Sequence, residues 1–192
     1  MKKLLLANCL AFLVGCDLPY VENSSAELIN GEVIMEDFDR NDLLNWNIVN
    51  DSVMGGRSQA TLKLVDNTYA DFKGYLSLRN NGGFSSIRAY YPPDLANIKS
   101  ILLKIRGDGR KYNFRIRGNN NSWASYTQSF ETIEGKWIEK ELKIDDFYPV
   151  YRGYNLKDMP LPSEIIIKEI GIMLSDKTEG SFNIDIDWIK AR

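Results

Sequence analysis

Short runs of alternating apolar and polar residues dominate this sequence and constrain its fold more than any other feature. No segment carries a long apolar repeat of 3.6 residues, apart from a helical turn expected at 41–46. Runs of this length, most of them bounded by Gly, Asn, Asp or Pro, are typical of strands. The expected strands are 33–38, 58–65, 68–78, 83–91, 99–106, 111–118, 123–130, 136–143, 166–175 and 181–190. This spacing predicts an all-β fold, an antiparallel β-sandwich or jelly roll.

Three of the turns between these runs predict β-hairpins. The turn residues are Asn-Asn-Gly-Gly at 80–83, Gly-Asp-Gly at 107–109, and the stretch 175–180. Such residues tolerate the positive φ angles of tight turns. Each hairpin would pair its two strands in one antiparallel sheet, with one face buried and the other solvated.

Hairpin pairing of 99–106 with 111–118 would gather cations on one face of the sheet. Side chains alternate across a strand, so the apolar residues of both runs would share the opposite face. The cations of this expected face, with one joining from 83–91, are Arg88, Lys104, Arg106, Arg115 and Arg117. The pattern is consistent with a solvated face balanced by acidic neighbours. It is also consistent with a platform for an acidic partner, because Arg matches carboxylate and phosphate.

The last run predicts a strand with one apolar and one acidic face. The apolar side chains are Phe182, Ile184, Ile186 and Trp188. Asp185 and Asp187 share the other face, about 7 Å apart. We favour Arg partners or an exposed edge for them. Paired acids for glycoside hydrolysis stay open, as does a structural Ca²⁺ site completed by Glu36, Asp37 or Asp39.

The segment NDSVMGGRS, residues 50–58, does not suit a sheet interior. Gly55 and Gly56 allow positive φ or close backbone approach, and a preceding Asp or Ser can bind the amides of its own loop. Arg57 is expected to pair with a carboxylate such as Asp176 or Asp187. A self-satisfied structural loop and a binding lip both explain the segment. The candidate loop site comprises Trp46, Asp51, Ser52, Arg57 and Arg152.

Aromatic residues in or beside loops favour either ordinary core packing or sugar binding. These residues are Trp46, Trp123, Tyr126, Tyr148, Tyr151 and Tyr154. Their rings supply core energy as readily as they supply a platform for a sugar. For any single ring we favour the core interpretation.

The absence of His from the sequence excludes a Ser-His-Asp triad and leaves Ser52 without an activating base. Because His is a usual protein ligand of zinc, its absence also argues against a zinc site. We therefore expect no enzyme activity and no cofactor, apart from the structural calcium kept above as an alternative.

The N-terminal residues resemble a lipoprotein signal. Lys2 and Lys3 precede an apolar run that ends in Leu-Val-Gly-Cys at Cys16, which resembles a lipobox. We expect a signal peptide at 1–16, a flexible tether at 17–31 and one domain at 32–192. Lipidated Cys16 would anchor the chain in a bacterial cell envelope, and Asp17 favours the inner membrane, facing the periplasm.

Removal of the signal would leave an acidic chain without a thiol. Loss of Lys2 and Lys3 from 24 Lys plus Arg leaves 22, against 26 Asp plus Glu, a net charge of about −4. This balance argues against nucleic acid as a partner. Loss of Cys9 and lipidation of Cys16 would exclude disulfide and Cys–metal chemistry.

Several stretches resemble the complex I intermediate-associated protein family. They are 46–58, 72–88, 105–112, 146–153, 172–177 and 186–189, in family order, so the resemblance covers nearly all of residues 32–190. It implies a galactose-binding-like jelly roll with no catalytic residues to carry over. The implied function is an assembly-factor-like domain that binds envelope proteins or a membrane complex, respiratory complexes included. A carbohydrate-binding module of the cell envelope is the alternative.

Overall fold

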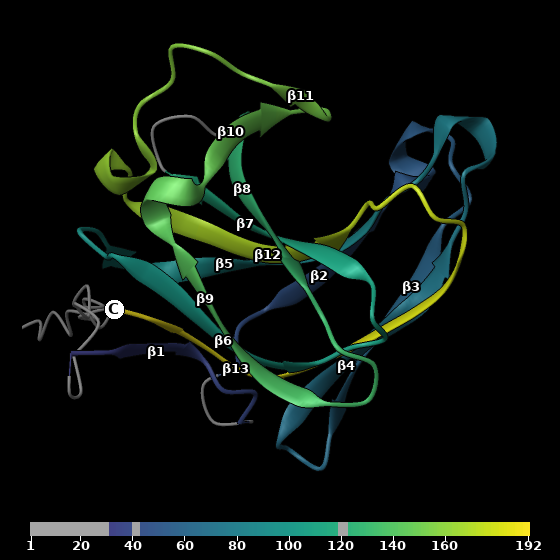
Figure 1. Ribbon diagram of the computed structural model, residues 1–192, viewed down its shortest axis with the longest axis horizontal. Helices are drawn as coiled ribbons and strands as arrows, with labels where there is room; N and C mark the ends of the chain where they lie inside the picture. Colours follow the sequence, from purple (N-terminus) through teal and green to yellow (C-terminus); the bar gives the residue numbers. More distant parts are fainter. Residues whose placement is uncertain (1–30, 40–42, 119–122) are drawn as a thin grey trace, which may run out of the picture.

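The computed structural model describes residues 31–39, 43–118 and 123–192, which form two antiparallel sheets packed face to face (Figure 1). The strands are β1 (Val33–Glu36), β2 (Trp46–Asn50), β3 (Gln59–Val65), β4 (Tyr69–Leu76), β5 (Ser85–Leu95), β6 (Ser100–Arg106), β7 (Lys111–Gly118), β8 (Ser125–Glu131), β9 (Trp137–Lys143), β10 (Tyr148–Tyr151), β11 (Tyr154–Asn155), β12 (Ile167–Leu174) and β13 (Gly180–Ala191). Four short 3-10 helices join them: η1 (Asp51–Met54), η2 (Arg79–Asn81), η3 (Ile144–Asp146) and η4 (Pro162–Glu164). No helix in these ranges is long and apolar enough to span a membrane.

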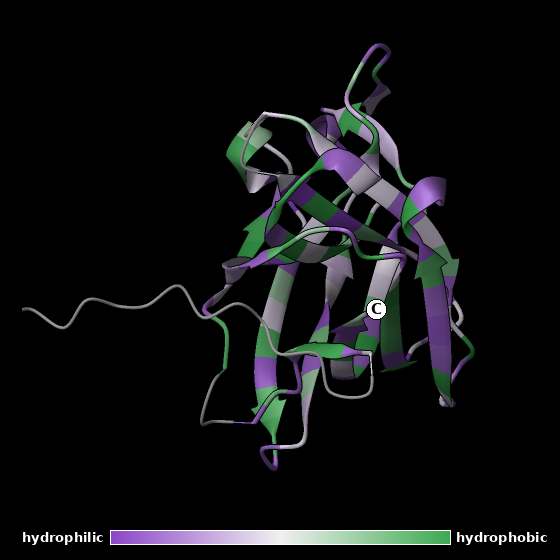
Figure 2. Cartoon of the chain, turned by 90° about the vertical axis from the view of Figure 1, so that its left-hand side faces the viewer, coloured by the Kyte–Doolittle hydropathy of each residue, from purple (hydrophilic) through white to green (hydrophobic). Residues whose placement is uncertain are grey.

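The first sheet, called sheet 1 below, has the order β3-β4-β13-β6-β9, with β1 also pairing β13. Sheet 2 has the order β11-β10-β8-β7-β12-β5-β2. Apolar and polar residues alternate along the strands (Figure 2), and the apolar ones from both sheets meet in one core. Phe72 and Phe182 on sheet 1 and Phe114 on sheet 2 are almost fully buried. The predicted all-β sandwich is confirmed.

Each of the ten predicted runs contains a strand, whereas three further strands were not predicted. These are β2, β10 and β11. The helical turn expected at 41–46 is wrong at its end, because Trp46 begins β2. The described ranges leave out the expected signal peptide at 1–16 and most of the tether at 17–31, and with them Cys16 and Asp17. They also leave out residues 41–42 of the expected helical turn.

All three predicted hairpins are wrong, because each turn carries the chain from one sheet to the other. The strand pairs β4 and β5, β6 and β7, and β12 and β13 each divide between sheets 1 and 2. The apolar faces of β6 and β7 are buried against each other across the core, so they do not lie side by side in one sheet. We call these three connections arches. The hairpins of this fold are β3–β4, which turns through Asp66 and Asn67 at positive φ, β7–β8 and β10–β11.

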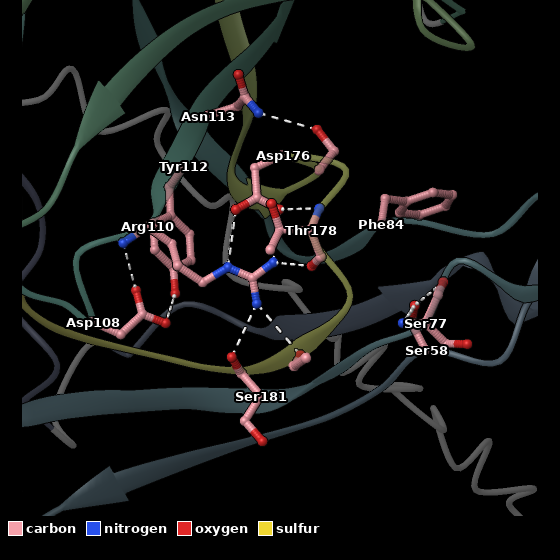
Figure 3. A network of polar contacts seen from close by, with 12 residues as sticks. Ser58, Ser77, Phe84, Asp108, Arg110, Tyr112, Asn113, Asp176, Thr178 and Ser181 are labelled. Atoms are coloured by element: carbon pink, nitrogen blue, oxygen red, sulfur yellow. Dashed lines mark hydrogen bonds and ion pairs between the residues drawn. The ribbon is translucent and has the colours of Figure 1, made fainter.

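A polar cluster at the arch end fixes two of the arches to each other (Figure 3). The Arg110 guanidinium donates to both carboxylate oxygens of Asp176, at 2.9 and 2.7 Å, and to the Ser181 carbonyl at 2.9 Å. Asp108 accepts the Tyr112 hydroxyl at 3.1 Å and the Asn183 amide at 2.8 Å. Half-buried carboxylates and backbone groups of the 107–110 and 175–183 segments thus hydrogen-bond to each other.

The face predicted for the last strand changes halfway along it. A register irregularity between Ile186 and Trp188 interrupts the pairing of β13 with β6. Ile184 and Ile186 point into the core before it, and Ile189 and Ala191 do so after it. Trp188 therefore lies on the outer surface, where the Lys190 ammonium sits 4.6 Å from its ring, and its predicted place on the apolar face is wrong. An extra residue in one strand moves every later side chain to the other face.

Replacement of Arg110 by Ala should lower the free energy of unfolding by about 1.5–3 kcal/mol, because it removes the guanidinium from the half-buried Asp176 carboxylate and from the carbonyls that it binds. Urea denaturation of the Arg110→Ala protein measures this loss. Lys111→Ala, an exposed neighbour, is the matched control and should change stability by less than about 0.5 kcal/mol. Equal stability of the two variants would mean that the cluster does not hold the arches.

Candidate functional site

Three arginines and one glutamate occupy the outer face of sheet 2. Arg88 lies on β5, Arg115 and Arg117 on β7, and Glu169 on β12, which runs between those two strands. Arg88 and Arg115 both stand opposite Gly171, one on each side, and Arg117 stands opposite Glu169. All four side chains are half-buried. We call this group the arginine cluster.

The arginine cluster contains more donors than acceptors. The Arg117 Nη1 lies 3.4 Å from Glu169 Oε1, but its buried Nε has no hydrogen-bond partner. Arg115 donates to the sulfur of Met173 at 3.1 Å and to the Ser125 hydroxyl, neither of which is an anion. For Arg88, the described ranges contain no hydrogen bond or ion pair. One carboxylate therefore serves three guanidinium groups.

Burial and mutual repulsion act on these cations together. Burial, then the charges of Arg88 and Arg117, lower the pKa of Arg115 to about 10. Burial, then the Arg117 charge, lower the pKa of Arg88 as well. Like charges on neighbouring strands destabilise a sheet unless an anion lies between them. Among the described residues, one ion pair to Glu169 therefore leaves most of this repulsion uncompensated.

Gly171, which stands opposite both Arg88 and Arg115, allows close approach of the neighbouring strand β5. A Cβ atom at this position would lie 2.6 Å from the Ile87 carbonyl oxygen and 3.2 Å from Arg88 Cγ. The aliphatic stem of Arg88 therefore lies against the bare backbone of β12, on the side that leads to Arg115. Any larger residue at this position would clash first with the backbone of β5, so the two strands could not keep this spacing.

The polar residues around the arginine cluster are satisfied internally. Asn113 donates to the Ser175 hydroxyl at 3.1 Å and accepts from the Ser129 hydroxyl at 2.8 Å. The Ser86 hydroxyl donates to the Val49 carbonyl at 2.9 Å. The surroundings are thus ordered, while the guanidinium groups retain free donors.

Lys104 and Arg106 do not join this cluster, so the predicted single face of five cations is wrong. Both lie on β6 in sheet 1, on the opposite outer surface of the sandwich. Lys104 pairs with Asp187 at 2.9 Å and Arg106 with Asp185 at 2.7 Å. The Arg106 guanidinium also lies 4.9 Å from the Trp137 ring centre. The arch between β6 and β7 separates the two sets, and only the set on sheet 2 is short of anions.

Asp51 is a structural residue of the NDSVMGGRS loop. Its carboxylate, 1% exposed, accepts the Ser58 amide at 2.8 Å, the Ser58 hydroxyl at 2.6 Å and the Gly83 amide at 2.6 Å. Burial raises its pKa, but these hydrogen bonds outweigh burial and hold the pKa below its ordinary value. A Cβ atom at Gly56 would lie 2.3 Å from Asp51 Cγ. A structural loop that satisfies its own hydrogen bonds thus accounts for the buried part of this segment.

The other members of the candidate loop site do not assemble around Asp51. Trp46 lies at the far end of β2, about 16 Å along the strand, where it donates to Glu36 at 2.8 Å. Arg152 lies in the β10–β11 turn, 5.3 Å from the Tyr151 ring. Ser52 is exposed on η1. The partners expected for Arg57 are engaged elsewhere, Asp176 by Arg110 and Asp187 by Lys104.

The acidic residues considered as calcium ligands have protein partners. Glu36 is buried and accepts the amides of Phe38 at 2.8 Å and Leu44 at 2.9 Å as well as the Trp46 indole. Burial raises the pKa of Glu36 despite these bonds. Asp185 and Asp187 form ion pairs with cations of β6. In the described ranges, no group of three or more acidic residues is placed to hold a metal ion.

Comparison by sequence relates the chain to one family. The profile of the family described as Complex I intermediate-associated protein 30 (CIA30) matches residues 36–186. The Mus musculus protein "Complex I intermediate-associated protein 30, mitochondrial" is 27% identical over 192 residues, covering 82% of this chain and 57% of that protein. A Caenorhabditis elegans protein, "Probable complex I intermediate-associated protein 30, mitochondrial", is 25% identical, covering 92% of this chain and 48% of that protein. The chain thus spans about half the length of these relatives.

Comparison of structures identifies the fold. A family 11 carbohydrate-binding module from Clostridium thermocellum, solved with a β-1,3-1,4-mixed-linked tetrasaccharide, superposes with a TM-score of 0.61 at 17% identity, covering 83% of this chain and 94% of that one. The family 11 module of the Clostridium thermocellum cellulase Lic26A-Cel5E gives a TM-score of 0.62 at 17% identity, covering 84% and 94%. At this identity the likeness concerns the fold, a galactose-binding-like jelly roll.

Asp51→Asn should lower the free energy of unfolding at neutral pH by about 1.5–3 kcal/mol, because an amide cannot accept every donor that the carboxylate accepts. The native pKa of Asp51 is depressed, so its contribution is present above the ordinary value of 3.8 and is lost as pH falls through the native pKa. Urea titrations of both proteins between pH 7 and 2 should show their difference shrinking below pH 4. A difference that stays constant over this range would exclude the carboxylate as its source.

Arg115→Met should leave the free energy of unfolding unchanged or raise it by up to about 2 kcal/mol at pH 7, because it relieves repulsion among buried cations. The pKa of Arg115 is lowered to about 10, so the penalty of the charge disappears as pH rises past that value. The advantage of the variant, measured by urea denaturation, should therefore shrink above pH 10. A variant clearly less stable than the native protein at pH 7 would show that the Arg115 charge is compensated within the fold.

Proposed function

The chain belongs to the complex I intermediate-associated protein 30 family, and from this premise we propose that it is a binding module without catalytic activity. It would grip an acidic segment of a protein partner through the arginine cluster and assist the assembly of an envelope complex, respiratory complexes included. One observation carries this proposal. Three half-buried arginines share a single carboxylate on the outer face of sheet 2.

The composition of the arginine cluster favours a carboxylate-rich ligand. Guanidinium groups match carboxylates in a planar, bidentate geometry. The cluster lies on strands of a rigid sheet, so it loses little conformational entropy when a partner binds. The chain is acidic as a whole, with 26 Asp plus Glu against 24 Lys plus Arg, which makes a local surplus of cations the more specific feature. Acidic partners would be steered to this face and repelled elsewhere.

A lipid anchor is the second part of the proposal. Acylation of Cys16, which lies outside the described residues, would hold the domain at a bacterial membrane, with Asp17 favouring the inner membrane. The relatives named above are mitochondrial proteins, and their name associates them with a complex I intermediate. We propose that the shared element is the grip on an incomplete membrane complex, whichever complex this is.

Carbohydrate binding is the second candidate, and exposed aromatic rings at the edge of sheet 2 favour it. Trp123 and Tyr151 meet edge to face at 5.3 Å, and Tyr148 and Tyr154 are exposed on β10 and β11. Exposed rings of this kind can stack on sugars. Titration with neutral and acidic envelope glycans should quench the fluorescence of Trp123 under this proposal. Unchanged emission across both classes would remove it.

Simultaneous change of Arg88, Arg115 and Arg117 to Gln should reduce partner recovery at least tenfold in a crosslinked pull-down from native membranes, because the attractive charges are lost while the fold is kept. Quantitative mass spectrometry of the captured proteins is the readout. The matched control changes three exposed lysines outside the cluster to Gln, which lowers the net charge by the same amount. These are Lys63, Lys111 and Lys136.

The proposal expects the control triple variant to retain the partners of the native protein. Equal loss in both triple variants would reduce the effect to net charge, and equal retention in both would remove the arginine cluster as the interface. Thermal denaturation of each variant establishes that the chain is folded in the assay.

A further inference from the structure

The exposed part of the NDSVMGGRS loop presents large apolar side chains at the surface. Val53 is 72% exposed and Met54 is 64% exposed, and Leu78 of the next arch is 41% exposed. Large apolar residues on a loop tip usually collapse onto their neighbours or are replaced by polar ones. Here three of them stand on two adjacent loops.

The loop that presents these residues is held rigidly from below. Asp51 ties the 50–58 loop to the 77–84 arch through the Ser58 and Gly83 amides, at 2.8 and 2.6 Å. Above it, the Asn80 side-chain amide donates to the Gly55 carbonyl at 3.1 Å, so η1 and η2 lie side by side. The exposed apolar side chains therefore sit on an ordered support, which lowers the entropic cost of binding.

A cationic cleft adjoins this apolar tip. It has a volume of about 420 Å³ and is lined by Arg57, Gln59, Tyr75, Ser77, Arg79 and Glu179. The described ranges contain no ion pair to either of its arginines. Its one acid, Glu179, accepts the Leu78 amide at 2.8 Å and so helps to fix the arch. Two cations therefore face one carboxylate that is partly engaged.

We propose that this surface, which we call the arch tip, docks a short protein segment that alternates apolar and acidic residues. An acidic side chain of the partner enters the cleft between Arg57 and Arg79, beside the exposed Tyr75 ring. Apolar side chains of the same segment cover Val53, Met54 and Leu78. The charge of the cleft selects the acid, and the apolar tip supplies the buried area.

The arch tip is a separate surface from the arginine cluster. Its residues lie on η1, η2 and the outer side of β3 and β4 in sheet 1, whereas the arginine cluster lies on the outer face of sheet 2. Binding at the arch tip can therefore be tested independently of the function proposed above. A partner that used both surfaces would reach around the arch end of the sandwich (Figure 1).

The test uses the full chain and a defined probe, a fluorescein-labelled peptide of alternating Leu and Glu. Peptides with Lys in place of Glu, and with Ser in place of Leu, serve as probe controls. Fluorescence anisotropy measures affinity, and amide NMR shifts of the labelled protein locate the site. We expect saturable binding of the Leu-Glu peptide alone, with shifts at Val53, Met54, Arg57, Leu78 and Arg79.

Two double variants decide whether both parts of the arch tip act. Arg57→Gln with Arg79→Gln, and Val53→Ser with Met54→Ser, should each weaken the Leu-Glu peptide at least tenfold. Both should keep the native melting temperature, because the changed side chains are exposed. The triple variant Arg88→Gln, Arg115→Gln and Arg117→Gln should still bind the peptide, with the same shifts at the arch tip as the native protein.

Three results would overturn the inference. These are absence of saturation at millimolar peptide, equal binding of the Lys peptide, and shifts confined to β5, β7 and β12. The last result would assign the peptide to the arginine cluster, so failure of this inference can be told apart from failure of the proposed function.

Discussion

Burial of two apolar strand faces against each other is the constraint on which the rest of this structure depends. The apolar sides of β6 and β7 face each other across the core, so the short connection between them changes sheets. The same holds for β4 to β5 and for β12 to β13. Each arch then brings polar backbone to the end of the sandwich, where the carboxylates of Asp51, Asp108 and Asp176 accept backbone amides and Arg110 donates to backbone carbonyls. The buried polar network is thus a consequence of the topology of the core.

The same constraint distributes the charges over the surface. Consecutive strands of similar sequence place their cations on opposite outer faces. On sheet 1, Arg106 and Lys104 find Asp185 and Asp187 on the neighbouring strand β13. On sheet 2, the neighbouring strand β12 offers Gly171 and Met173 beside Arg115, and one glutamate at Arg117. The fold therefore pairs Lys104 and Arg106 on one face, whereas the other face keeps a surplus of positive charge.

The alternation of apolar and polar residues predicted where most strands lie, but it did not predict which strands pair in a sheet. Turn residues such as those at 80–83 allow tight turns at positive φ in hairpins and arches alike, so local chemistry does not distinguish them. The sequence did not predict β10, because Pro149 interrupts its alternation of apolar and polar residues. The register irregularity between Ile186 and Trp188 turns Trp188 toward the surface, which the sequence pattern did not indicate. The sequence pattern predicted that Arg115 and Arg117 share a face. The positions of Gly171 and Glu169 beside them follow only from the register of β12.

Membership in the family and the jelly-roll fold both accord with a role in binding, and we propose that the arginine cluster supplies the chemistry of that binding. The most direct test is the NMR spectrum of the arginine Nε–Hε groups during titration with a glutamate octapeptide. The account predicts saturable shifts for Arg88, Arg115 and Arg117, while Arg106 and Arg110, already paired with Asp185 and Asp176, stay unchanged. Shifts that follow solvent exposure alone, or that leave the cluster unmoved, would contradict it.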